Sequence, residues 1–174
     1  MAIVEALVIG IIAGVVASLC YALIKRVVRP KIKIASVIIH DEDNDIMIIK
    51  VINRTKTRIT DVECYLQYYK YLTNGYNVRD LQSKRKITPT IERYENDKDT
   101  VGAPSLYAVQ YGFTIPDDVS FDEKDKLVFS IKGVHPVSGT ITYETKEFVF
   151  DGRHVLKDVC YDAGDNIGVH KKMM

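Results

Sequence analysis

The sequence predicts a mainly β protein in which a single N-terminal transmembrane helix precedes an antiparallel β-sandwich. Residues 6–24 carry no charge, and a run of lysines and arginines follows them. Beyond residue 30 the continuous apolar pattern gives way to alternating apolar and polar residues, with turn residues between the apolar runs. Such short, regularly spaced segments indicate a sandwich of immunoglobulin-like or jelly-roll-like type, with a small β-barrel as the second choice.

The uncharged run is long enough to cross a bilayer. At 1.5 Å per residue, residues 6–24 reach about 28 Å, close to the thickness of the hydrocarbon core. A secretory signal would begin with positive residues and end at a small-residue cleavage site. Here Glu5 is the only early charge, and the positive cluster follows the apolar run. We therefore predict an uncleaved anchor over residues 1–30.

The basic flank of the anchor predicts its orientation. Its members are Lys25, Arg26, Arg29, Lys31 and Lys33. Because lysine and arginine accumulate on the cytoplasmic side of membrane helices, we expect a single-pass protein of the cell membrane with a cytoplasmic β domain. The same charges attract anionic lipid headgroups. In the opposite orientation, Asn53-Arg54-Thr55 would form a glycosylation motif.

Small residues recur at every fourth position of the anchor and share one helix face: Ala6, Gly10, Gly14 and Ser18. Gly10 and Gly14 form a GxxxG, which lets two helix backbones approach closely in lipid. This face predicts a homodimer or a contact with another membrane protein. The competing interpretation is an anchor that merely contains small residues.

The domain predicted over residues 31–160 opens with a hairpin. Residues 31–40 and 46–53 are β-rich runs that flank the acidic turn 41–45. The next strand, 59–72, alternates: Val62, Cys64, Leu66 and Tyr68 share one face, and Asp61, Glu63, Tyr65 and Gln67 share the other. This alternation is typical of a sheet with one face in water. Asn74-Gly75 then supplies a turn.

The second half of the domain contains three clear strands and a less regular middle. Residues 77–88 read as a long connection with a short strand, and 90–94 as an edge strand. Residues 105–115, 126–134 and 140–150 are apolar and aromatic strands, the last two joined by the turn 137–139. The segment 161–174 is expected to be a flexible tail.

Catalytic and metal-binding patterns are weak throughout. Asp41, Asp43 and Asp45 begin like a calcium loop, but Ile46 stands where the turn glycine belongs. A zinc site built from His135, His154 and Cys160 has no supporting spacing, and a disulfide between Cys64 and Cys160 is left open. We expect neither an enzyme nor a cofactor. The net charge of +1 gives no reason to expect nucleic acid.

Tyrosine is the enriched residue type, with eleven in the chain. Several lie along 59–72, near a basic segment, so we predict a ligand or partner surface formed by Tyr69, Tyr71, Arg79, Lys84, Arg85 and Lys86. The alternative is that tyrosine simply fits a half-buried pleated surface.

Two functions follow from these features. The first is a non-enzymatic, membrane-anchored β-sandwich that acts as a binding or assembly module for an unidentified ligand or protein. The alternative is a ligand-gated effector that perturbs the membrane, in which the β domain senses a small anionic ligand and drives helix oligomerisation. That architecture is similar to bacterial antiphage effectors that join membrane helices to a β-barrel sensor. The likeness is architectural and rests on no shared motif.

Overall fold

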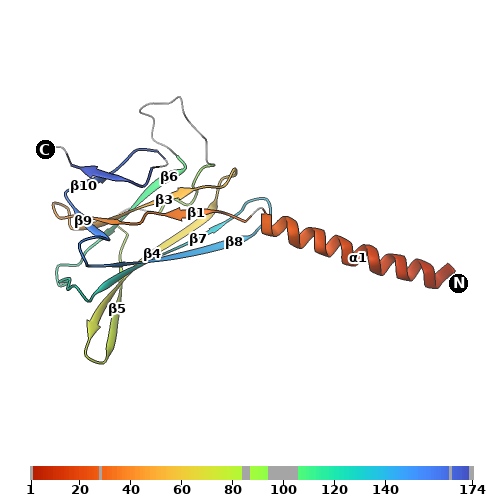
Figure 1. Cartoon of the computed structure of the whole chain (residues 1–174), viewed down its shortest axis with the longest axis horizontal. Coiled ribbons are helices and arrows are strands. Elements are labelled where there is room, and N and C mark those ends of the chain that lie inside the picture. The colour runs from red at the N-terminus through yellow and green to blue at the C-terminus, as the bar shows by residue number, and fades with distance from the viewer. Residues whose placement is uncertain (1, 28, 84–86, 94–105, 165, 173–174) are drawn as a thin grey trace.

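The computed structural model describes residues 2–27, 29–83, 87–93, 106–164 and 166–172. One helix, α1 (Ala2–Val27), extends away from a β domain (Figure 1). The strands within the described residues are β1 (Ile32–Ile34), β2 (Ile38–Asp41), β3 (Ile46–Asn53), β4 (Thr60–Leu72), β5 (Gly75–Leu81), β6 (Ala108–Thr114), β7 (Lys126–Val134), β8 (Ile141–Val149), β9 (Val155–Lys157), β10 (Val159–Tyr161) and β11 (Val169–Lys171).

The strands form two main sheets and a small hairpin. In the first sheet β3 pairs with β1 and β2 on one side and with β6 on the other, all antiparallel, while β9 runs parallel to β2. The second sheet has the antiparallel order β5-β4-β7-β8. The chain crosses from β3 to β4, back from β5 to β6, and again from β6 to β7. This is the strand order of an immunoglobulin-like sandwich.

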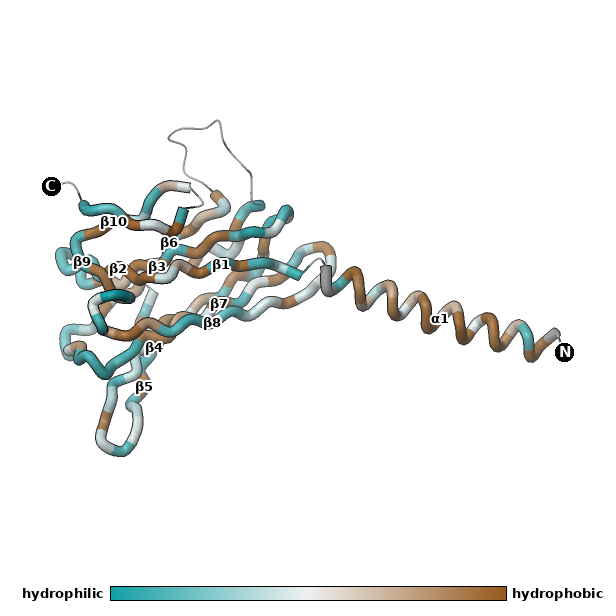
Figure 2. Tube along the Cα trace, viewed as in Figure 1, coloured by the Kyte–Doolittle hydropathy of each residue, from teal (hydrophilic) through white to brown (hydrophobic). Residues whose placement is uncertain are grey.

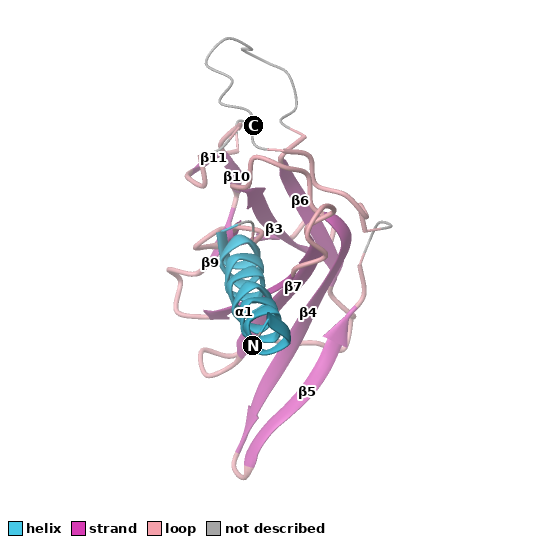
Figure 3. Cartoon of the chain, turned by 90° about the vertical axis from the view of Figure 1, so that its right-hand side faces the viewer, coloured by secondary structure: helices cyan, strands magenta, loops and turns pink. Residues whose placement is uncertain are grey.

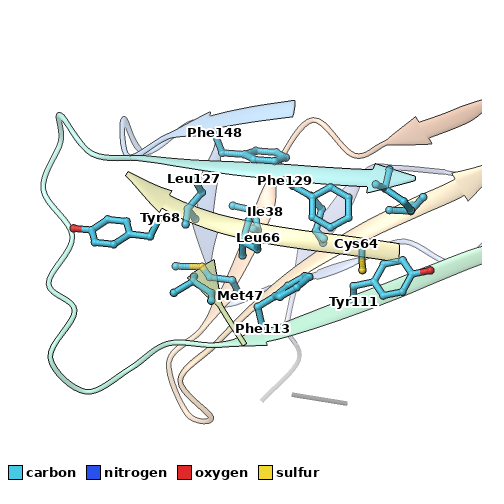
Figure 4. Packing of buried hydrophobic residues seen from close by; sticks show 14 of the residues in the cluster. Ile38, Met47, Cys64, Leu66, Tyr68, Tyr111, Phe113, Leu127, Phe129 and Phe148 are labelled. Carbon is cyan, nitrogen blue, oxygen red and sulfur yellow. The ribbon is translucent and has the colours of Figure 1, made fainter. Parts of the chain in front are cut away.

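The predicted fold class is confirmed. The domain is mainly β, its sheets are antiparallel apart from the β2–β9 pair, and the described strands do not close into a barrel. The core lies between the two sheets (Figure 4). The side chains that the alternation of β4 assigned to the core are all buried, and they meet Phe113, Phe129 and Phe148 from three other strands. The aromatic rings of Phe113 and Phe129 pack edge to face at 6.0 Å.

The strand boundaries follow the predictions closely in most places. The predicted runs 46–53 and 126–134 coincide with β3 and β7, and those at 59–72 and 140–150 match β4 and β8 within a residue. The first run is broken by a bend at residues 36–37, which separates β1 from β2. The edge strand predicted at 90–94 is reduced to one bridge between Ile91 and Ile59, and residue 94 lies outside the described residues.

Two segments carry more structure than expected. Where we expected a long connection with a short strand, β5 pairs with β4 along seven residues. Beyond residue 160, β11 pairs with β10, so regular structure continues into the segment expected to be a flexible tail. Contacts with the sheet around β3 order this segment. The Lys50 ammonium donates hydrogen bonds of 2.6 Å to the carbonyl oxygens of Asp162 and Asn166, and the Tyr161 hydroxyl donates one to the carbonyl of Val37.

The junction between α1 and the sandwich is short and hydrogen-bonded. The Thr142 hydroxyl donates a buried hydrogen bond of 3.1 Å to the Pro30 carbonyl. The backbone N–H of Lys31 donates to the Thr55 hydroxyl, and that of Arg54 donates to the Lys31 carbonyl. The domain therefore begins within a few residues of the helix end.

Candidate functional site

The helix α1 is long and apolar enough to cross a membrane. The span Ile3–Lys25 carries charge only at Glu5 and Lys25, and its apolar stretch is not buried against the domain. Figure 2 shows apolar residues recurring along the length of the helix. An apolar surface of this size is unfavourable in water unless a membrane or a partner covers it. The chain thus combines one potential membrane-spanning helix with a β domain.

The predicted association face of α1 is open. Ala6, Gly10, Gly14 and Ser18 are exposed. A Cβ atom built on Gly10 or Gly14 would meet nothing within 4 Å. The Ser18 hydroxyl donates a hydrogen bond of 2.8 Å to the Gly14 carbonyl, so its polar group is satisfied within the helix. A second helix can approach this face without obstruction, and its association stays a prediction.

The predicted basic flank surrounds the point where the helix ends. Lys25, Arg29, Lys31 and Lys33 are exposed, and the side chain of Arg26 lies outside the described residues. The Lys25 ammonium lies 4.8 Å from the centre of the Tyr21 ring. A tyrosine and a lysine at this depth are typical of the interface between lipid tails and headgroups.

A second candidate site is the hairpin formed by the end of β4 and by β5, which projects from the sandwich (Figure 3). We call residues 69–78 the tyrosine hairpin. Antiparallel pairing places Tyr71 opposite Tyr76, and Tyr69 opposite Val78. Directly paired residues point to the same face of a sheet, so these four side chains lie together.

Aromatic rings and lysines pack against one another on this face. The Tyr76 ring lies 5.6 Å from that of Tyr71 and 6.2 Å from that of Tyr69. The Lys126 ammonium lies 5.3 Å from the Tyr69 ring and 5.1 Å from the Tyr76 ring, and the Lys124 ammonium lies 5.3 Å from the Tyr71 ring. Tyr71 and Tyr76 remain nearly half exposed. The face offers rigid aromatic surface together with positive charge.

A buried carboxylate fixes the base of the tyrosine hairpin. Asp125 is 1% exposed and accepts hydrogen bonds from the Tyr68 hydroxyl at 2.6 Å, the Tyr71 backbone N–H at 2.8 Å and the Asp122 backbone N–H at 2.9 Å. Burial raises the pKa of Asp125, but the three hydrogen-bond donors together lower it by more than burial raises it. The net pKa therefore lies below the usual value. The carboxylate therefore stays ionised and holds β4 against the loop that leads into β7.

The structure brings together only part of the surface predicted from the sequence. Tyr69 and Tyr71 lie on the tyrosine hairpin, whereas Arg79 points to its opposite face and bonds to the Asp118 carboxylate at 2.6 Å. Lys84, Arg85 and Lys86 lie outside the described residues. Sequence reasoning missed Tyr76 and Lys126. The predicted turn at Asn74-Gly75 is off by one residue: the turn residues are Thr73 and Asn74, because Leu72 already pairs with Gly75. A two-residue turn at 74–75 would have paired Tyr71 with Val78, so the predicted register did not place Tyr76 opposite Tyr71.

Two cavities meet at His40, which lines both. One, of about 270 Å³, also contains Lys172 and four carboxylates: Asp41, Glu42, Asp43 and Asp158. The other, of about 500 Å³, contains Lys157 and three carboxylates: Asp45, Asp122 and Glu123. Burial lowers the pKa of His40, which favours its neutral form. Carboxylates outnumber cations in both cavities, so neither has the chemistry that capture of a small anionic ligand needs.

The weaker sequence candidates lie apart. His135 is buried in the turn between β7 and β8, His154 bonds to the Asp151 carboxylate, and Cys160 lies in β10. Within the described part of the chain, no three His, Cys, Asp or Glu side chains are grouped to hold a metal ion. Cys64 and Cys160 are free thiols, and burial raises the pKa of Cys64 to about 12.

Comparison with known proteins does not assign a function. No protein-family model matches the chain, and no curated protein matches it. The arguments for function therefore rest on the chain's own residues.

Proposed function

We propose that this protein is a single-pass membrane protein that holds an immunoglobulin-like sandwich at the membrane surface as a non-enzymatic binding or assembly module. The observation that carries this proposal is the complete exposure of the apolar side chains of α1. A helix of 26 residues that is not buried against the domain has the length and composition that a bilayer accommodates. The basic flank favours a cytoplasmic domain, because positive charge is retained on that side.

The tyrosine hairpin supports the binding role. Tyrosine supplies large, rigid contact area at low cost in conformational entropy, and interface hot spots are enriched in it. Asp125 fixes the hairpin before any partner arrives, which lowers the entropic cost of binding. With Lys124 and Lys126 over the rings, the surface suits a protein partner that presents acidic side chains around an apolar centre.

Extraction of membranes at alkaline pH tests the anchor. The full chain is expected to stay with the membrane pellet, since an inserted helix resists such extraction. A variant with Leu7→Lys, Ile11→Lys and Val15→Lys should move to the soluble fraction, because each charge at the helix centre costs about 3 kcal/mol on insertion. A matched variant with alanine at the same three positions should stay in the pellet. Release of the unmodified chain would contradict the anchor.

Crosslinking in membranes tests the assembly role of the helix. Gly10→Ile with Gly14→Ile should abolish a crosslinked dimer, because the added side chains keep two backbones apart on the open face. Ile9→Leu with Val16→Leu, away from that face, serves as the matched control and should leave the dimer intact. An undiminished dimer in the isoleucine variant would remove self-association from the proposal.

A further inference from the structure

Segments distant in sequence meet at the end of the sandwich from which α1 leaves (Figure 1). The Pro30 carbonyl is bonded to Thr142 at the start of β8, and Lys31 exchanges bonds with Arg54 and Thr55 in the loop between β3 and β4. These contacts place two loops beside the helix end: the β3–β4 loop, residues 54–59, and the β7–β8 turn, residues 135–140. We call this region the helix-side end.

The β7–β8 turn is built to present one apolar side chain. The backbone N–H of His135 donates to the Thr140 carbonyl, and that of Gly139 donates to the His135 carbonyl, both at 2.9 Å. The Ser138 N–H donates to Nδ1 of His135, which is itself buried. Val137, between them, is 85% exposed, more than any other large hydrophobic side chain in the described residues. A single exposed valine is ordinary on a protein surface, and this one matters because of its position at the end of the sandwich from which α1 leaves.

The β3–β4 loop adds positive charge beside that valine. Lys56 and Arg58 are exposed on this loop. Its shape is fixed by Asn53, whose fully buried amide donates 2.8 Å hydrogen bonds to the carbonyls of Thr57 and Glu92. Because Asn53 is buried, a glycan on its amide would not fit this fold. The glycosylation motif noted for the opposite orientation therefore does not support that orientation. Two exposed carboxylates, Asp61 and Glu92, lie near these loops, so the charge of this end is mixed but mainly basic once the helix flank is included.

Chain length places this end at the depth of the lipid headgroups. Three residues separate the end of α1 from Lys31, which is already bonded to the sandwich. An extended chain spans at most about 3.5 Å per residue, so these three residues bridge no more than about 10 Å. The headgroup layer on one side of a bilayer is itself about 5 to 8 Å thick. Loops bonded to Pro30 and Lys31 therefore lie in this layer or directly above it when the helix spans the membrane, within reach of the headgroups.

We propose that the helix-side end is a second membrane contact, in which Lys56 and Arg58 bind anionic phospholipid headgroups and Val137 enters the interface. This proposal rests on the proposed anchor and deepens it. The helix fixes the depth of the domain, and the two loops then fix its tilt. The tyrosine hairpin, at the far end of β4, is thereby kept away from the bilayer and open to a partner in solution.

Tryptophan fluorescence provides the test, since the chain contains no tryptophan. Three single variants of the full chain are reconstituted in vesicles with brominated phosphatidylcholine and anionic phosphatidylserine. Ala13→Trp reports insertion of the helix, Val137→Trp reports the proposed contact, and Tyr76→Trp reports the tyrosine hairpin. Val137 contacts solvent, so tryptophan there displaces no core side chain. Bromine quenches only nearby rings. Ala13→Trp and Val137→Trp are each expected to lose about half or more of their fluorescence, and Tyr76→Trp to lose almost none.

The outcomes separate the two proposals. An unquenched Ala13→Trp would overturn the anchor itself. The second contact would be overturned if Ala13→Trp is quenched while Val137→Trp stays as bright as Tyr76→Trp. The proposed anchor would stand in that case.

Charge reversal tests the ionic part. Lys56→Glu with Arg58→Glu, added to Val137→Trp, should reduce its quenching in phosphatidylserine vesicles at low salt and much less in pure phosphatidylcholine. Lys70→Glu with Lys124→Glu makes the same change in net charge near the tyrosine hairpin and should leave the quenching unaltered. Equal effects of the two pairs would overturn the assignment of headgroup binding to Lys56 and Arg58.

Discussion

The two sheets of the sandwich differ in what covers their outer faces. The outer face of the sheet around β3 lies beneath the C-terminal segment, where Ala35, Ile39 and Tyr161 form a small second core. Among the described residues, no such segment lies over the outer face of the sheet around β4 and β7. Tyr65 and Tyr143 on this face are more than half exposed, and only Val128 and Ser130 at the centre of β7 are buried there. One sheet is therefore a structural support with both faces packed, and the other presents a face that is open to a partner.

The sequences of the two central strands reflect this difference. β3 reads IMIIKVIN, and every residue from Ile49 to Asn53 is buried, because alternate side chains face the main core and the C-terminal segment. β4 alternates buried and exposed residues as far as Tyr68. A continuous apolar strand indicates cover on both faces, whereas an alternating strand indicates one wet face. The comparison shows that the open face belongs to the sheet that carries the tyrosine hairpin.

Removing the cover should have the largest effect. Tyr161→Ala is expected to lower the free energy of unfolding by about 3 kcal/mol, because it empties a buried aromatic site and removes the hydrogen bond to the Val37 carbonyl. Urea unfolding of the full chain in detergent micelles, followed by circular dichroism of the β domain, measures this loss.

Tyr65→Ala on the open face is the matched control. It removes the same side chain from an exposed position and should change the free energy of unfolding by no more than about 0.5 kcal/mol. Equal losses in the two variants would mean that the outer faces do not differ in packing.

Sequence reasoning predicted the parts of this fold that depend on local pattern. The helix followed from its lack of charge, and the buried face of β4 followed from alternation at Val62, Cys64, Leu66 and Tyr68. The strands β3, β7 and β8 followed from their apolar runs. These features are recorded within a few neighbouring residues, so no knowledge of tertiary contacts was needed.

The parts that sequence reasoning missed depend on contacts between distant segments. The Lys50 ammonium binds carbonyls more than a hundred positions later. A lysine within an apolar strand suggests that it has some buried partner, but the neighbouring residues do not indicate which one. Arg79 and its partner Asp118 are 39 positions apart, which is also beyond the range of a local pattern. The segment 161–174 was expected to be flexible because its residues are largely polar. Tyr161, Ile167 and Val169 nevertheless pack against the sheet around β3, and a short polar sequence does not by itself indicate such a contact.

A somewhat smaller loss of stability is expected from a change at the base of the tyrosine hairpin. Asp125→Asn should cost about 2 kcal/mol, because it replaces an ionised acceptor of three hydrogen bonds by a neutral amide. Since the folded-state pKa of Asp125 is lowered, its carboxylate contributes stability above the unfolded-state value of about 4, and this contribution is lost as the pH falls through the folded-state pKa.

Unfolding of both chains across the acidic range checks this prediction. The difference in unfolding free energy between the parent chain and Asp125→Asn should be constant near neutral pH and shrink in acid. A difference that grows in acid would contradict the assigned direction of the pKa shift.

A smaller effect is expected at the contact between β3 and the C-terminal segment. Lys50→Met keeps the side chain's length but leaves the carbonyls of Asp162 and Asn166 without this donor, at a cost of about 1 to 2 kcal/mol. Hydrogen exchange should quicken at the paired amides of β10 and β11 and stay unchanged in β4 and β7. Lys56→Met, on an exposed loop, controls for loss of charge, and uniform acceleration across all strands would show that the contact is not local.

The smallest effect on stability should come from the tyrosine hairpin itself. Tyr76→Ser removes a ring that is nearly half exposed and that contacts Tyr69, Tyr71 and Lys126 on the hairpin face, so the free energy of unfolding should fall by no more than about 1 kcal/mol. Tyr68→Phe provides the contrast, because it removes the buried hydroxyl that bonds to Asp125 and leaves a similar ring. A larger loss for Tyr76→Ser than for Tyr68→Phe would mean that the exposed rings are needed for folding. The opposite order would mean that folding does not require the exposed rings. Their presence on the surface would then be explained by contact with a partner.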